Sequence, residues 1–295
     1  MFDFRYHALS LVAVLVALGI GLLLGVAVGD KELVGSAQTD LAHGLRHDVN
    51  NARAQSRTLQ NQLKQRQDFE EQAFPALVEN LLVGQRVGLV FMGGASRDLY
   101  DNVRDAVVAA GGELRFTAGV REPPDVNGLA GRASGTRFST LADDDSLLRP
   151  FAQGAGRSIA LGGALAGRIR STLFDSFSGE LDGVDAVVVV RLGDGPGDDE
   201  HAGQIRDVEE GLVDGLNGTD IPVVGAERTD TDPSHVSWYR ERGLASVDDV
   251  DEVAGRVALV YALAGRAEGA YGVKGSAEGI LPRVVEGQVP TTTTG

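Results

Sequence analysis

The chain has 295 residues, of which 43% are hydrophobic, and it carries 42 Asp and Glu against 27 Lys and Arg, a formal net charge of −15. That length predicts one large domain or two ordinary ones. The acidity argues against a nucleic-acid-binding protein, because affinity for the phosphate backbone depends on clustered Lys and Arg. The absence of Cys excludes disulfide scaffolds, thiolate catalysis and Cys-type zinc sites.

The segment from Ala8 to Val28 contains no charged residue and a single hydroxyl, that of Ser10. At about 1.5 Å per residue, a helix of this length spans a hydrocarbon core of roughly 30 Å. It is longer than the 7–15 apolar residues of a usual signal peptide. We therefore expect an uncleaved anchor within residues 1–29, with a cleaved signal peptide or a buried core helix as alternatives.

The residues that flank this segment predict its orientation. Arg5 and the free amine precede it, whereas Asp30, Lys31 and Glu32 follow it. Basic groups are retained in the cytoplasm, so this small bias favours a cytoplasmic N-terminus and an extracytoplasmic bulk.

Residues 30–78 are predicted to form a helical stalk. Small and apolar side chains recur there at alternating steps of three and four, which is the spacing of a heptad seam: Ala42, Leu45, Val49, Ala52, Ser56, Leu59 and Leu63. We expect this helix to self-associate, although an amphipathic helix lying on the following domain would have the same pattern. Phe69, Phe74 and Pro75 are predicted to mark where the stalk docks and ends, because proline cannot continue a helix interior.

His43 and His47 are the candidate metal ligands. They lie four residues apart and hence on one helical face, with Asp40 one turn earlier. Imidazole and carboxylate could hold Cu(II) or Zn(II) at this spacing, but the sequence offers no further ligand nearby. A solvated polar face is the alternative interpretation.

Residues 79–286 are predicted to form an α/β domain with a mostly parallel sheet. Continuous apolar runs of the kind found in buried parallel strands occupy Arg86–Phe91, Ala186–Arg191 and Ile221–Ala226, and Glu113–Thr117 completes an opening βαβ unit. Helices are predicted around Leu99–Val108, at Ala164–Phe177 and Gln204–Leu216, and over a segment capped by Ser246 that includes Val253–Leu263. Residues 287–295 are predicted to be a disordered tail.

No motif in this domain identifies a catalytic centre. The turn Gly93–Ser96 joins a strand to a helix and could hold an anion, but it lacks the glycine spacing of dinucleotide and P-loop sites, so a plain turn is the better interpretation. The acidic loop Gly193–His201 could bind Ca²⁺, although a solvated face is favoured. His235 could equally be a packing or a catalytic residue. We expect the protein not to be an enzyme and to need no identifiable cofactor.

Two stretches carry a family resemblance. The first runs from Arg5-Tyr6-His7-Ala8-Leu9-Ser10 into the hydrophobic segment. The second comprises Ala245–Asp251, Gly255–Val260 and Gly272. Together with the order of anchor, stalk and α/β domain, they resemble the actinobacterial copper transporter family MctB. The resemblance implies copper efflux or homeostasis at the cell envelope, a channel-forming role, and copper as a bound ion.

The residues themselves leave the mechanism open. Cu(I) transport normally uses Cys and Met, and only Met1 and Met92 are present. A scaffold that self-associates through its stalk and anchor without transporting metal is the alternative function. An anchored enzyme with a flavodoxin-like or nucleotide-binding domain is the third.

Overall fold

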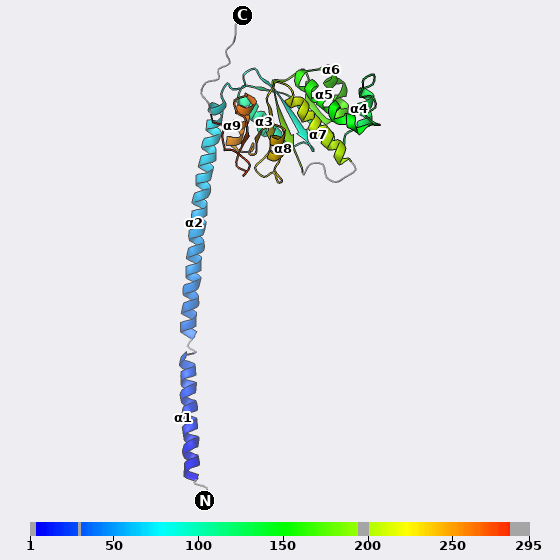
Figure 1. Cartoon of the computed structure of the whole chain (residues 1–295). Helices are drawn as coiled ribbons and strands as arrows, with labels where there is room; N and C mark the ends of the chain where they lie inside the picture. Colours follow the sequence, from blue (N-terminus) through cyan, green and yellow to red (C-terminus); the bar gives the residue numbers. More distant parts are fainter. Residues whose placement is uncertain (1–3, 29–30, 194–200, 284–295) are drawn as a thin grey trace. The chain divides into compact units, whose positions relative to one another are not determined.

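The computed structural model describes residues 4–28, 31–193 and 201–283 and divides the chain into two compact units, 1–68 and 69–295. The predicted tail 287–295 and most of the acidic loop Gly193–His201 lie outside the described residues. The first unit contains α1 (Phe4–Val28) and most of α2 (Lys31–Val78). Figure 1 shows both as separate helices, coloured blue to cyan.

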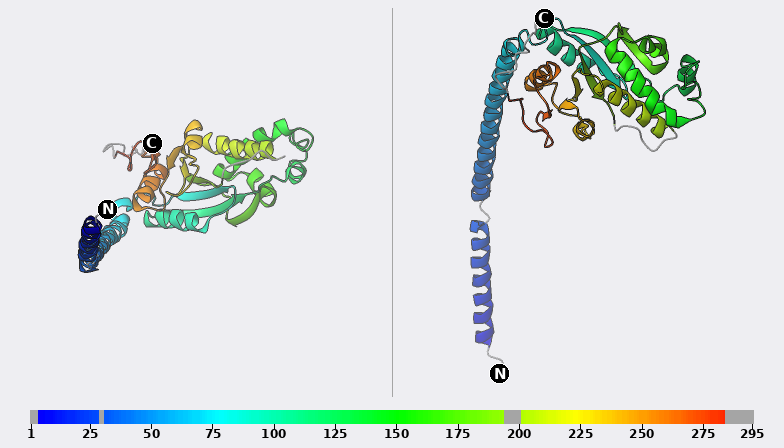
Figure 2. Two further views of the ribbon diagram at one scale, coloured as in Figure 1. Left: turned by 90° about the horizontal axis from the view of Figure 1, so that it is seen from below. Right: turned by 45° about the horizontal axis from the view of Figure 1, so that its top comes forward.

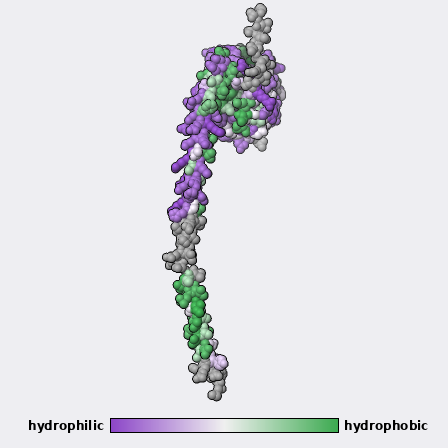
Figure 3. Space-filling model, turned by 90° about the vertical axis from the view of Figure 1, so that its left-hand side faces the viewer, coloured by the Kyte–Doolittle hydropathy of each residue, from purple (hydrophilic) through white to green (hydrophobic). Residues whose placement is uncertain are grey.

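The hydrophobic helix α1 has the length and composition of a membrane span. Tyr6–Ala27 has a mean hydropathy of 2.8, and none of its most apolar window is buried within the structure. Figure 3 shows α1 as hydrophobic over the face in view. Because water would not stabilise such a surface, a bilayer is the environment that suits this helix.

The helix α2 is longer than the predicted heptad pattern. It continues past Pro75 and ends at Val78. Pro75 was predicted to end the helix, and this prediction is wrong. The residue lies inside α2, three residues before the last helical residue, Val78. Phe74 and Val78 are buried, at 4% and 0% exposed, whereas Phe69 is 71% exposed. The predicted docking is thus made by Phe74 and not by Phe69.

The second unit is a seven-stranded sheet with the order β3-β2-β1-β4-β5-β6-β7, and all neighbours are parallel except β2 and β3. The strands are β1 (Arg86–Met92), β2 (Glu113–Val120), β3 (Phe174–Gly179), β4 (Ala186–Arg191), β5 (Val223–Ala226), β6 (Ala245–Val247) and β7 (Ala270–Tyr271). The mostly parallel α/β architecture is confirmed.

Helices cover both faces of this sheet, as the two views in Figure 2 show. One core packs the end of α2 with α3 (Arg97–Ala109) and α9 (Val253–Leu263). The other packs five helices: α4 (Val126–Arg132), α5 (Leu148–Leu161), α6 (Ala164–Leu173), α7 (Ala202–Asn217) and α8 (Val236–Glu241). A short 3-10 helix, Asp145–Leu147, precedes α5.

The central strands explain why the sheet must be covered on both sides. In β4, Val188 and Val190 face the first core while Val187 and Val189 face the second, and all four are 0% exposed. Each buried valine contributes roughly 1.5–3 kcal/mol relative to an exposed one. A strand with no polar face is stable only between two layers of helices.

Two predicted elements were wrong. The expected helix Ala164–Phe177 ends at Leu173, and Phe174 begins β3, which pairs antiparallel with β2. Ser246 does not cap a helix: it lies within β6 at 1% exposed, and Glu252 is the N-cap residue of α9. The strand β6 has only 3 residues, so its sequence pattern cannot distinguish it from the start of a helix.

Candidate functional site

The carboxyl ends of β1 and β4 form the topological switch point of the sheet. The chain passes from β1 to β2 on one side, and the strand on the other side of β1 is β4. In open α/β sheets, ligands usually bind in the crevice beyond the strand ends at this position. The polar residues gathered there are therefore the first place to look for a functional site.

A buried ion pair lies at the end of β4. The guanidinium of Arg191 donates to both carboxylate oxygens of Glu209 on α7, with Nη2 3.0 Å from Oε2. Their side chains are only 10% and 2% exposed. The Trp238 ring lies 5.0 Å from the Arg191 Cζ atom and 4.0 Å from that of Arg242. The pair is fixed in place, because charges so deeply buried are tolerated only when they are paired.

The backbone of Arg191 is positioned by Tyr239. Its N–H donates to the Tyr239 hydroxyl at 2.9 Å, and that hydroxyl donates to the carbonyl of Ala226 at 3.3 Å. A Cβ at Gly225 would lie 2.4 Å from Tyr239 Cγ, so glycine lets the ring pack directly on β5. Burial raises the pKa of the Tyr239 hydroxyl above its usual range. The hydroxyl therefore acts as a structural link and stays protonated.

Glu122 follows β2, and its side chain reaches the turn that follows β1. Its Oε1 accepts the N–H of Gly93 at 2.8 Å. Burial first, and then the negative charge of Glu209, raises the pKa of Glu122. The turn Gly93–Ser96 therefore already has a carboxylate where a phosphate would have to bind, and Ser96 caps α3 by accepting the N–H of Leu99. This favours the plain turn over an anion site.

A second buried acid, Glu227, follows β5. It is 1% exposed and accepts the Ser234 hydroxyl, the His235 backbone N–H and the Lys274 ammonium, each at 2.6 Å. His235 is itself 4% exposed, and its Nε2 has no hydrogen-bond partner among the described residues. Burial, and next the charge of Arg191, lowers the pKa of His235. A neutral imidazole packed at the start of α8 is the result.

The residues at the switch point thus form a network of paired charges. Arg191 neutralises Glu209 and Lys274 neutralises Glu227, and Glu122 is the half-buried acid whose pKa burial raises. Across the residues that the structure describes, no group of three or more His, Cys, Asp or Glu side chains is arranged to hold a metal ion. The network can order the strand ends, and its described residues offer no ready set of metal ligands.

The predicted ligands His43 and His47 lie outside the α/β unit, on α2. Both are exposed, and Nδ1 of His47 is 3.1 Å from the Asn51 side-chain nitrogen. The helix places them one turn apart, as their spacing predicts. Their role as metal ligands stays a prediction.

Glu122, Glu209 and Glu227 are not among the residues predicted from the sequence. Only Glu209 had a usable signal: it lies inside the apolar stripe of α7 formed by Ile205, Val208 and Leu212, where a charge is unexpected. The other two follow strands, and nothing in their neighbours distinguishes them from loop residues.

A protein-family model matches nearly the whole chain. Residues 1–282 match the model of the family described as copper transport outer membrane protein, MctB. No curated protein sequence matches the chain. The match extends over α1, α2 and every strand of the sheet, so the expected resemblance is confirmed over nearly the whole chain. The chain belongs to the MctB family of copper transport outer membrane proteins.

Proposed function

We propose that this protein acts in copper efflux or homeostasis at the cell envelope, as a membrane-anchored protein that self-associates. The family match carries this proposal, because it includes the hydrophobic helix, α2 and the α/β unit. Copper is the cargo in this proposal and not a resident cofactor. The N-terminus lies in the cytoplasm and the α/β unit outside it, as Arg5 before α1 favours.

The ligand inventory supports an indirect role for the α/β unit. Met92 is 0% exposed within the core, so its sulfur is not available to a passing Cu(I) ion. The sheet cannot line a membrane pore either, because helices bury both of its faces. We infer that copper crosses elsewhere in the assembly, and that this unit organises the assembly or binds a partner.

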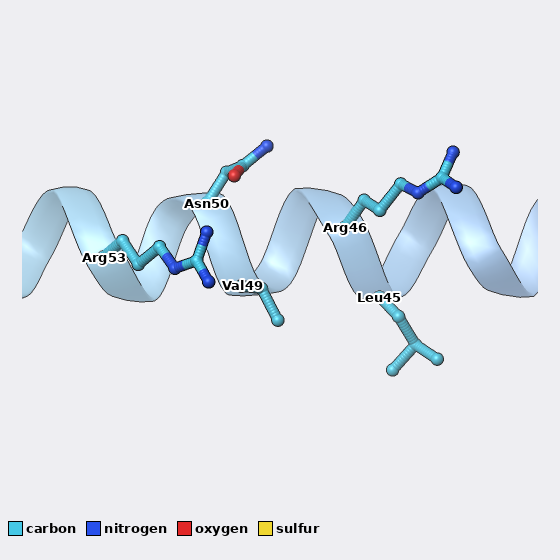
Figure 4. A pocket seen from close by; sticks show the side chains of 5 residues that line it. All are labelled: Leu45, Arg46, Val49, Asn50 and Arg53. Carbon is cyan, nitrogen blue, oxygen red and sulfur yellow. The ribbon is translucent and has the colours of Figure 1, made fainter.

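A scaffold without direct metal transport is the second candidate, and an observation on α2 favours it. Leu45, Val49, Leu59 and Leu63 are 46–59% exposed along one side of the helix. Figure 4 shows Leu45 and Val49 pointing to one side of α2 while Arg46 and Asn50 point to the other. A seam of this kind is stabilised by burial against a second helix.

Copper tolerance tests the proposed function. A strain lacking the gene is complemented with the parent protein or with a variant lacking residues 1–28, and cell copper is measured by mass spectrometry. We expect the parent to restore tolerance and lower cell copper, and the anchorless variant to do neither. Equal copper content with and without the parent protein would contradict a role in efflux and favour the scaffold.

Protease accessibility tests the orientation. Protease added to intact spheroplasts should remove the α/β unit and leave a short fragment containing α1. Full protection would reverse the orientation, and release of soluble protein lacking the first ~30 residues would identify a signal peptide.

A further inference from the structure

A groove on the α/β unit has no role in the site described above. The end of α2 supplies Leu77, α9 supplies Val253 and Val257, and the C-terminal segment supplies Ile280 and Leu281. Its volume is about 510 Å³, within the roughly 300–1,000 Å³ of small-molecule sites. Figure 3 shows hydrophobic residues exposed on one face of this unit.

The aliphatic walls of the groove are about half exposed. Leu77, Val273, Ile280 and Leu281 are 47–55% exposed. Each would gain free energy by leaving water, at about 25 cal/mol for every Å² buried. The groove therefore favours an occupant with an apolar body.

Asp249 lines the same groove and is the polar group that demands a partner. It is 1% exposed, and neither of its carboxylate oxygens has a hydrogen-bond partner among the described residues. The preceding Asp248 is equally buried but accepts the N–H of Val273 at 2.8 Å and that of Lys274 at 3.3 Å. Because unpaired buried carboxylates are costly, Asp249 lacks a donor that its neighbour has.

The groove around Asp249 is acidic, so a positively charged donor suits it best. Glu70 and Glu252 also line the groove, and none of its described lining residues is Lys, Arg or His. Asp251 accepts from the Thr229 N–H and hydroxyl at 2.8 and 3.1 Å.

Three bases are next in sequence to groove-lining residues: Arg228, Arg256 and Lys274. Each contacts other groups, and Arg228 contacts Asp98 and Asp230. The Lys274 ammonium contacts Glu227 and the Thr231 carbonyl, and the Arg256 guanidinium contacts Glu71 and the Phe74 ring. A positive charge for this acidic groove must therefore come from its occupant.

We propose that this groove binds a small amphiphilic organic cation, whose ammonium or amidinium head donates hydrogen bonds to Asp249 and whose aliphatic body lies against Leu77, Val257 and Leu281. The head satisfies an otherwise unpaired carboxylate by a charge-assisted hydrogen bond. The body covers apolar surface that faces water in its absence.

This binding depends on pH. Burial, and next the charge of Asp248, raises the pKa of Asp249 to about 7. The ligand binds the ionised carboxylate, so its affinity rises between pH 6 and pH 8. The charges of Asp248, Asp251 and Glu252 act on this carboxyl. Glu70 lines the same groove, and Arg228, Arg256 and Lys274 are next in sequence to lining residues.

Calorimetric titration with n-octylammonium tests the proposal. Both cores lie within residues 69–295, so a fragment of residues 60–295 retains the contacts that fold this unit and needs no detergent. We expect octylammonium to bind more tightly at pH 8 than at pH 6, and more tightly than octan-1-ol or octanoate. Asp249→Asn should weaken binding at least tenfold, whereas Glu241→Gln, an exposed acid on α8, should leave it unchanged.

Apolar variants complete the test. Leu281→Ser should weaken binding, and the matched control Leu161→Ser, another exposed leucine, should not. Equal affinity of the parent and Asp249→Asn for octylammonium would overturn the proposal, as would equal affinity for octan-1-ol. Dimerisation of the fragment that Leu281→Ser abolishes would overturn it as well, because the groove would then be an interface between two copies of this chain.

Discussion

At the scale of single residues, burial changes the protonation of Asp249 and thereby the stability of the α/β unit. The pKa of Asp249 is about 7 in the folded protein, against 3.8 for an ordinary aspartate. The folded state therefore binds this proton more tightly than the unfolded state. The contribution of Asp249 to the free energy of unfolding therefore falls as the pH rises from about 4 to about 7. Above pH 7 this contribution is constant.

Asp249→Asn removes this dependence. We expect the variant to unfold at a higher temperature than the parent at pH 8, by about 2–4 °C for each kcal/mol recovered in a domain of this size. The difference should shrink progressively towards pH 4.5, where the parent carboxyl is neutral. Thermal denaturation of both proteins across this range measures it, and a difference that is constant with pH would show that Asp249 ionises normally.

The pair of Arg191 and Glu209 supports a second prediction for single residues. Removing one partner leaves the other charge buried and unpaired, so Glu209→Leu should cost about 3–5 kcal/mol. The double variant Arg191→Met with Glu209→Leu should recover most of that loss, since neither charge remains. Urea denaturation of the parent, both single variants and the double variant gives the coupling free energy. Additive losses would mean that the two side chains stabilise the fold independently.

At the scale of elements, the sequence predicted those elements whose patterns are set by burial on both faces. The valine run of β4 and the apolar stripe of α7 could be read directly. The strand β3 could not, because its sequence Phe-Asp-Ser-Phe-Ser-Gly is mostly exposed and it pairs only with β2 at the edge of the sheet. The burial of Asp249 could not be predicted for the opposite reason: four acids within five residues are typical of a solvated face. Only the packing around β6 and α9 buries two of them, Asp248 and Asp249.

The seam of α2 gives the prediction for elements. Leu59→Asp with Leu63→Asp should reduce self-association, because carboxylates would be forced into an apolar contact between helices. Asn61→Asp with Gln65→Asp is the matched control, since it adds the same charge on the opposite side of the helix. Sedimentation of residues 31–295 measures the oligomer. A parent protein that is monomeric at tens of micromolar would refute self-association through this seam.

At the scale of the whole molecule, copper chemistry depends on which ligands the fold leaves accessible. The chain has no Cys, and Met92 is enclosed in the core. His43 and His47 are exposed one turn apart on α2, whereas His235 is buried. Imidazole ligands suit Cu(II) better than Cu(I). Any direct binding by the region that follows α1 should therefore favour Cu(II) and involve α2.

Metal titration of residues 31–295 tests this expectation, with Cu(I) and Cu(II) competing against chelators of known affinity. We expect weak Cu(II) binding, because two imidazoles leave the coordination sphere to be completed by water. Binding should weaken in acid, because metal ligands must be deprotonated. It should be lost when His43 and His47 are both changed to Ala, and His201→Ala is the control that should leave it unchanged.

Tight Cu(I) binding would contradict this ligand assignment, since the core would have to open to expose Met92. A complete lack of copper binding would assign the copper function of the family to the assembled membrane helices or to a partner, and the α/β unit to their organisation.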